Sequence, residues 1–215
     1  MRNVDQREGD LAFEFEPHML CEGMIVSERG EPTREEKIQD ALSAAPRFIA
    51  ETATVLDADM KTVLREGSPD WICVPTPPGQ PAPGPMCLDP TWMQFVQEVM
   101  QGKTPTIDRI GISYMLMGEA GADFDDVFAT QPPEGKDWYR AGPHEMFCFP
   151  QGTGHILKGI GHDPSSGQPY VRPVRGAEPM LVVPVAKPGE TACGCRSDCP
   201  CCRNNSAAPD SESSA

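Results

Sequence analysis

The sequence lacks any apolar run near the ~20 residues that a transmembrane helix needs. Residues 1–6 also lack the hydrophobic stretch of a secretory signal peptide. We therefore expect a protein without a membrane span, which stays in the cytoplasm if Met1 is the true start of the chain.

Positive charge is scarce: 18 Lys and Arg residues stand against 32 Asp and Glu residues, for a formal net charge of -14. Phosphate binding requires a basic surface, so this balance argues against a nucleic-acid partner and against an anionic membrane. The same charge favours a soluble protein.

Common catalytic motifs are also missing from the sequence. It contains no Gly-x-Ser-x-Gly, no His-Glu-x-x-His and no phosphate-binding loop. Internal repeats are absent as well. The sequence therefore indicates no class of enzyme, and whether the protein is an enzyme stays open.

Proline and glycine are abundant, with 24 and 20 residues, which is typical of long irregular connections. Two helices interrupt them. The first begins with a capping box, Thr33-Arg34-Glu35-Glu36, and ends near Pro46. The second has Asp89 as its N-cap and Pro90 at its first position, and it stops at Gly102.

Short runs rich in β-branched and aromatic residues predict strands. Three of them, separated by polar turns, have the pattern of an antiparallel meander: 54–57, 61–65 and 71–74. Residues 107–117 are apolar or small on both faces, as in a central strand. Two more candidates are 144–149 and 181–185. We therefore predict an α+β fold in which a small, mainly antiparallel sheet packs against two helices, with long Pro/Gly-rich loops.

The sequence divides into three segments by composition. Residues 1–32 are charge-rich and are interpreted as an N-terminal arm. Residues 33–187 would form the α+β domain. Residues 188–215 are Cys-rich and then rich in Ser, Asn and Ala, so we predict a disordered tail.

Several sequence elements occur in an order that is distinctive in combination. They include Val63-Leu64-Arg65-Glu66-Gly67, Trp71-Ile72-Cys73-Val74-Pro75, Pro85-Met86-Cys87-Leu88-Asp89 and Gly142-Pro143-His144. Together, residues 38–147 resemble a family of small, uncharacterised bacterial proteins, many of them exported. The resemblance implies no activity. Exported relatives would carry a signal peptide, and relatives tend to have a His near the last strand, where this chain has Glu178-Pro179-Met180.

Cys73 and Cys87 lie where the Pro-rich loop begins and ends. A disulfide between them would hold a strand to a helix and would stabilise the fold by roughly 3 kcal/mol. Exported relatives favour this pairing. In a reducing cytosol the two residues would instead be buried thiols. The nine cysteines of the chain cannot all pair with one another, because their number is odd.

The most concentrated chemical signal is a group of five thiols within ten residues: Cys193, Cys195, Cys199, Cys201 and Cys202. Thiolates are soft ligands that suit Cu(I) and Zn(II), and four of them can close a tetrahedral zinc site. The leading hypothesis is therefore a soluble protein whose tail binds Zn or Cu(I), for buffering or resistance. Adventitious metal binding, disulfide formation and a redox pair are the alternatives for these cysteines.

His144 and Cys148 are four residues apart on a predicted strand, so their side chains share one face. A Cys–His pair could be a nucleophilic dyad or half of a metal site. The rival hypothesis is therefore a small enzyme or ligand-binding domain that uses these two residues, although a satisfied structural histidine is the simpler interpretation. A third hypothesis is an interaction module with an unknown protein partner.

Two further groups could bind ions. One loop contains three carboxylates but lacks the remaining oxygen ligands of a calcium site: Asp123, Asp125 and Asp126. Three methionines, together with Cys148, could line a copper site, although Met in a strand is more often core filler: Met115, Met117 and Met146.

Overall fold

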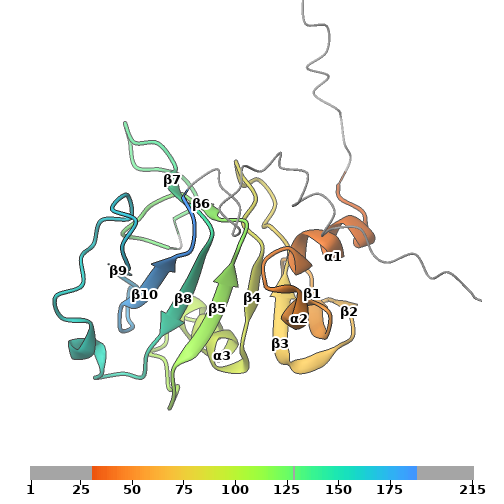
Figure 1. Cartoon of the computed structure of the whole chain (residues 1–215), viewed down its shortest axis with the longest axis horizontal. Coiled ribbons are helices and arrows are strands. Elements are labelled where there is room, and N and C mark those ends of the chain that lie inside the picture. The colour runs from red at the N-terminus through yellow and green to blue at the C-terminus, as the bar shows by residue number, and fades with distance from the viewer. Residues whose placement is uncertain (1–30, 128, 188–215) are drawn as a thin grey trace, which may run out of the picture. The chain divides into compact units, whose positions relative to one another are not determined.

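A computed structural model describes residues 31–127 and 129–187 of the chain (Figure 1). Residues 1–30, 128 and 188–215 lie outside the described residues, and so do most of the predicted arm and the whole predicted tail. None of the helices in the described residues is both long and apolar enough to cross a membrane.

The described residues form two sheets and four helical segments. The large sheet contains β1 (Ala53–Leu56), β2 (Val63–Arg65), β3 (Ser68–Val74), β4 (Met86–Leu88), β5 (Gly111–Met115), β8 (His144–Cys148), β9 (Tyr170–Arg172) and β10 (Met180–Pro184). The small sheet contains β6 (Glu119–Gly121) and β7 (Tyr139–Ala141). The helices are α1 (Arg34–Leu42), α2 (Arg47–Ala50), α3 (Pro90–Met100) and the 3-10 turn η1 (Gly154–Leu157).

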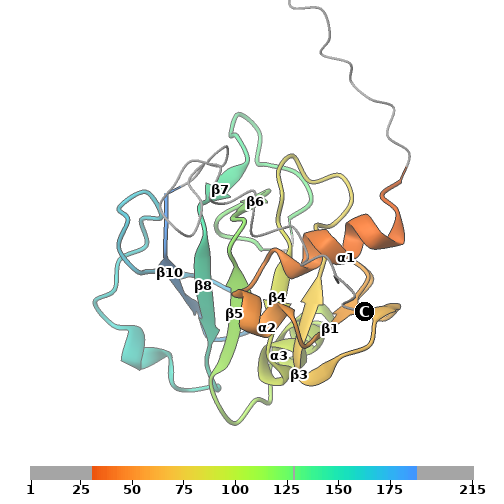
Figure 2. The ribbon, with the colours of Figure 1, turned by 45° about the vertical axis from the view of Figure 1, so that its right-hand side comes forward.

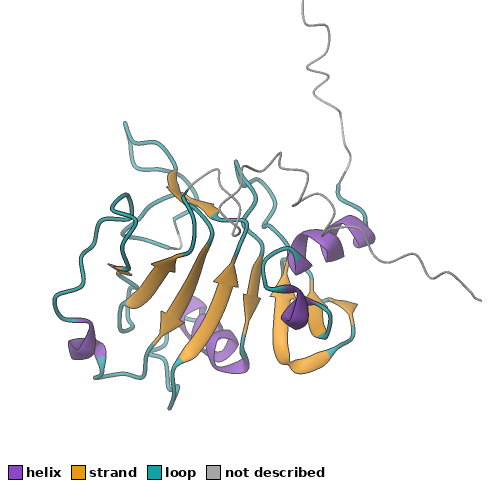
Figure 3. Ribbon diagram, viewed as in Figure 1, coloured by secondary structure: helices purple, strands orange, loops and turns teal. Residues whose placement is uncertain are grey.

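The fold is mostly sheet, and the predicted α+β fold with a small, mainly antiparallel sheet on two helices is wrong (Figure 3). The large sheet has eight strands in the order β2-β1-β3-β4-β5-β8-β10-β9, and β1 and β3 are parallel. The three α-helices are only 9, 4 and 11 residues long. Strands β4 and β9 have three residues each, too few to show an alternating pattern in the sequence.

The expected meander is also wrong, because β3 does not pair with β2. It crosses to the other side of β1 and runs parallel to it. The crossing occurs at Gly67, where an added Cβ would collide with the carbonyl oxygens of Thr52 and Ala53. A glycine is therefore required for the chain to pass the start of β1 so closely.

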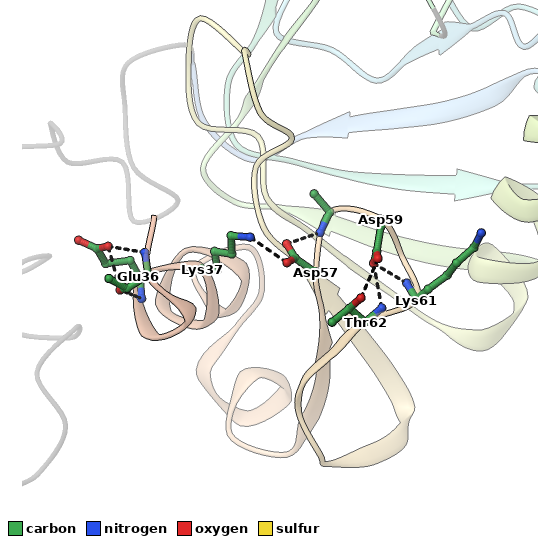
Figure 4. Close-up of polar contacts among 8 residues, drawn as sticks. Glu36, Lys37, Asp57, Asp59, Lys61 and Thr62 are labelled. Atoms are coloured by element: carbon green, nitrogen blue, oxygen red, sulfur yellow. Dashed lines mark hydrogen bonds and ion pairs between the residues drawn. The ribbon is translucent and has the colours of Figure 1, made fainter. Parts of the chain in front are cut away.

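Local polar contacts fix the first helix and the first hairpin (Figure 4). The predicted capping box is confirmed: the Glu36 amide donates to the Thr33 hydroxyl, and the Thr33 amide donates to the Glu36 carboxylate. In the β1–β2 turn, the Asp59 carboxylate accepts hydrogen bonds from the Lys61 and Thr62 amides at 2.9 and 2.8 Å. These donors lower the pKa of Asp59 to about 2.

Helices cover both faces of the large sheet, with α1 and α2 on one side and α3 on the other (Figure 2). The Asp89 N-cap and Pro90 begin α3 as predicted, and its apolar stripe is buried, including Trp92, Phe95 and Val99. Alternate residues of β5 and β8 pack beneath this stripe and form the main core. The α3-facing side of β5 and β8 is the surface on which the candidate site is built.

Cys73 and Cys87 are opposite each other on β3 and β4 and are joined by a disulfide. Both residues are completely buried against α1 and α2, within the cluster that contains Ala41 and Val55. The bond therefore connects two neighbouring strands, whereas the sequence suggested a bond between a strand and a helix.

Candidate functional site

A cavity of about 250 Å³ lies between α3 and the sheet. Its walls come from α3, from β4, β5, β8 and β10, from the β6 region, and from the Pro-rich loop that precedes β4. Most of the lining is apolar, and four methionines contribute to it: Met86, Met115, Met146 and Met180. Methionine side chains are flexible and polarisable, so this wall can adapt to the shape of a bound molecule.

Two charged side chains also line the cavity, Arg172 on β9 and Glu119 on β6. The Arg172 guanidinium donates to the Glu119 carboxylate at 2.7 Å, and the two side chains are only 3% and 16% exposed. The guanidinium also donates to the carbonyl oxygens of Asp123 and Phe124, at 2.8 and 3.1 Å. Its positive charge is therefore matched and its position is fixed.

Aromatic rings surround this ion pair. The guanidinium carbon of Arg172 lies 4.6 Å from the centre of the Tyr139 ring, a cation–π arrangement. The hydroxyl groups of Tyr139 and Tyr170 are hydrogen-bonded to each other. Burial raises the pKa of Tyr170 to about 12 and raises the pKa of Tyr139 further, so both phenols stay neutral near pH 7.

His144 begins β8 beside this cluster and is 1% exposed. Its Nδ1 lies 2.6 Å from the carbonyl oxygen of Gly142, which can only accept, so Nδ1 carries the proton. Burial lowers the pKa of His144, so the ring is neutral near pH 7. The lone pair is then on Nε2, which has no hydrogen-bond partner among the described residues.

His144 and Tyr170 do not line this cavity but line a second one of about 750 Å³. The rest of its wall comes mainly from loop segments, including residues 164–167 and 185–187. Most of these loop residues are exposed, whereas buried apolar side chains line much of the first cavity, which makes the first the stronger candidate for a small-molecule site.

The structure does not bring His144 and Cys148 together. Their side chains share the α3-facing side of β8, but a rise of ~3.3 Å per residue separates them by roughly 13 Å. Met146 lies between them. Cys148 is fully buried, and burial raises the pKa of its thiol to about 12, so it is not a nucleophile near pH 7. These two residues cannot form a catalytic dyad in this arrangement.

The other predicted ligand groups fare differently. The five tail cysteines lie outside the described residues: Cys193, Cys195, Cys199, Cys201 and Cys202. Within the described residues, no three His, Cys, Asp or Glu side chains gather to hold a metal ion, and this includes the Asp123–Asp126 loop. Met117 is 50% exposed, whereas Met115 and Met146 are buried and belong to the main core.

Sequence reasoning missed the Arg172–Glu119 pair, whose members are 53 residues apart. One local signal was present. Arg172 follows Tyr170 and Val171 in an otherwise apolar run, and a charge at such a position suggests an inward-facing side chain with a partner. The identity of that partner depends on the pairing of distant strands.

No family model matches this sequence, and the comparisons with curated proteins and with solved structures also give no significant match. The function of the site is therefore inferred from its own residues.

Proposed function

We propose that this protein binds a small, neutral, mainly apolar molecule in the cavity beneath α3. The observation that carries the proposal is the cavity itself: about 250 Å³, lined by methionines and aromatic residues, with a buried ion pair in its wall. Ligand sites in proteins commonly combine an apolar wall with a few placed polar groups, in volumes of about 300–1,000 Å³. The smaller volume here suits a molecule of one or two rings.

The ion pair in the wall of the cavity favours a neutral ligand over a charged one. A ligand carboxylate would have to displace Glu119 from Arg172, and removing one member of a buried pair is costly. The net charge of -14 would also repel anions at long range. A neutral ligand can fill the apolar part of the cavity and leave the pair intact.

Binding is favoured over catalysis because the two charged side chains of the lining, Arg172 and Glu119, are paired with each other. Cys148 does not line this cavity, and burial raises the pKa of its thiol to about 12. The Arg172 guanidinium is held by Glu119 and by backbone carbonyls. These groups can position a ligand but supply neither an activated nucleophile nor an obvious general base.

The test is a fluorescence titration of the full-length protein with N-phenyl-1-naphthylamine, a neutral apolar probe. Val96 lines the cavity, so the V96F substitution should fill part of it and weaken binding about tenfold or more, a change of ~1.4 kcal/mol. Val63 is exposed on β2, away from the cavity, and V63F is the matched control that should leave binding unchanged. Equal affinity of wild type and folded V96F would exclude this cavity as the site.

We also propose, from the sequence, that the tail binds a soft metal ion, Zn(II) or Cu(I), through its five cysteines. The close spacing of these thiols supports this second function. Metal content after purification should fall when all five are replaced by serine and should not fall for Ser211→Ala and Ser213→Ala in the same segment. Unchanged metal content in the cysteine-free tail would reject it.

A further inference from the structure

The described residues contain three buried polar side-chain atoms without a hydrogen-bond partner: Trp92 Nε1, Ser113 Oγ and His144 Nε2. A buried polar group without a partner costs free energy and calls for an explanation. His144 stands apart from the other two because its second nitrogen is anchored. The bond from Nδ1 to the Gly142 carbonyl fixes the ring and leaves Nε2 as an acceptor.

The neighbours of His144 on the sheet are Pro184 on β10 and two methionines. Met115 is its direct cross-strand partner on β5, and Met146 is two positions along β8. The buried residues of both strands alternate, so all three side chains point to the α3-facing side. Directly opposed Cβ atoms on one face are about 4.5–5.5 Å apart, within reach of a shared ion for long side chains.

We propose that His144 Nε2 and the sulfur atoms of Met115 and Met146 form a Cu(I) site on the α3-facing side of β5 and β8. Thioether sulfur is a soft donor that selects Cu(I), and imidazole is an accepted ligand of copper. The Gly142 carbonyl supplies the outer hydrogen bond that metal-binding histidines generally make. A metal bond to Nε2 would satisfy the buried atom that has no partner among the described residues.

The donor set distinguishes Cu(I) from Zn(II). All three donors are neutral, and structural zinc sites usually contain four ligands from Cys, His or carboxylate side chains. A monovalent ion is also less costly to bury than a divalent one, because desolvation grows with charge. The nearby charges of Arg172 and Glu119 offset each other, so they neither favour nor prevent a single positive charge.

The disulfide supports thioether ligands over thiolates. The Cys73–Cys87 bond persists in oxidising surroundings, where thiols that are not bound to a metal oxidise. Methionine sulfur cannot form a disulfide and keeps its lone pairs under the same conditions. A copper site made of His144 and two methionines could therefore coexist with this bond, unlike one that depends on reduced cysteines.

The experiment uses the full-length chain with Cys21 and the five tail cysteines replaced by serine, which removes the competing thiols and keeps the disulfide and Cys148. Cu(I) is titrated anaerobically against the chelator bicinchoninate. One Cu(I) should bind per chain, and H144Q, M115L and M146L should each weaken binding by at least about tenfold. X-ray absorption should detect sulfur and nitrogen ligands, with one sulfur fewer in M115L.

Two matched Met→Leu variants control for general effects. Met117 is exposed just beyond the end of β5. Met180 lines the same cavity as Met115 and Met146 but is outside the proposed donor set. M117L and M180L should bind Cu(I) as tightly as the parent. Leu replaces Met with little change in volume, and thermal unfolding checks that each variant is folded.

Two results would overturn the proposal: no Cu(I) binding in competition with bicinchoninate, or binding that none of the three substitutions weakens. Either would leave the ligand-binding proposal standing, because the naphthylamine titration reports on the cavity without copper. Loss of probe binding in V96F with intact Cu(I) binding would separate the two sites in the opposite direction.

Discussion

Arg172 on β9 donates a 2.7 Å hydrogen bond to Glu119 on β6, and this ion pair connects the edge of the eight-stranded sheet to the two-stranded sheet. Both side chains are largely buried, and the carbonyl oxygens of Asp123 and Phe124 accept the other hydrogen bonds of the guanidinium. Such an ion pair adds little net stability by itself. However, removing one partner is costly, because the other charge is then buried without a counter-charge.

Replacing Arg172 with methionine should therefore destabilise the protein by about 3–5 kcal/mol, because Glu119 would keep a buried charge without its partner. Urea unfolding followed by circular dichroism measures the change. The double variant R172M/E119Q should recover part of the loss. The control is R175M, since Arg175 is exposed and pairs with Asp126 at the surface, where ion pairs contribute about 0–1 kcal/mol. Equal losses of stability in R172M and R175M would contradict the prediction that the buried pair matters more than the surface pair.

Removal of the disulfide with C73A/C87A should lower the free energy of unfolding by roughly 3 kcal/mol, since the bond closes a loop of 14 residues. Denaturant unfolding with and without a reducing agent provides the measurement. The reducing agent should lower the free energy of unfolding of the wild type and leave that of the double variant unchanged. A wild type that is insensitive to full reduction would show that the bond adds nothing to stability.

The Asp57 carboxylate should make stability depend on pH in the acid range. The Lys37 ammonium, 2.8 Å away, holds the pKa of Asp57 below its usual value of 3.8. The stabilisation is therefore present above pH 3.8 and is lost as the pH falls through the lower pKa of the folded protein. D57N should be less stable near neutral pH by about 1 kcal/mol and should lose this acid dependence. D108N, at an exposed pair, should keep the wild-type profile.

A methyl group at Gly111 should destabilise the core. A Cβ there would lie 2.7 Å from both the Cys148 sulfur and the Trp92 amide nitrogen, where α3 packs closely on β5. We expect G111A to cost about 1–3 kcal/mol, as overpacked cores do. Gly161 has open space around the same position, so G161A is the control and should change the melting temperature little. If G111A leaves the stability unchanged, α3 is able to move away from the sheet.

Local signals in the sequence were sufficient to place the helix starts. The capping box at Thr33 and Glu36 and the N-cap at Asp89 depend on residues three apart, so neighbouring side chains alone specify them. The sheet was harder to predict because its pairing is non-local. The parallel pairing of β1 and β3 and the three-residue strands β4 and β9 have no local signature, so the predicted fold class was wrong.

The candidate site was predictable only in part, for the same reason. His144 could be selected from the sequence, but pairing it with Cys148 considered only positions along one strand. The partner that the structure places beside it, Met115, comes from a strand about thirty residues earlier, and the register decides this neighbour. The cavity has walls from six strands and a helix, and no single segment of sequence carries its signature.

The disulfide closes a ring of chain that runs from β3 to β4 and includes neither β1 nor β2. Apart from chain connectivity, noncovalent contacts alone hold those two strands to the remainder of the sheet. The β3–β4 pair is therefore cross-linked covalently, whereas the β1–β3 pair is not. Native-state amide exchange should be faster in β1 and β2 than in β4 and β5, with the change in rate at the β1–β3 boundary. Strands β1 and β2 would then open as a cooperative unit while the disulfide-bonded strands stay closed.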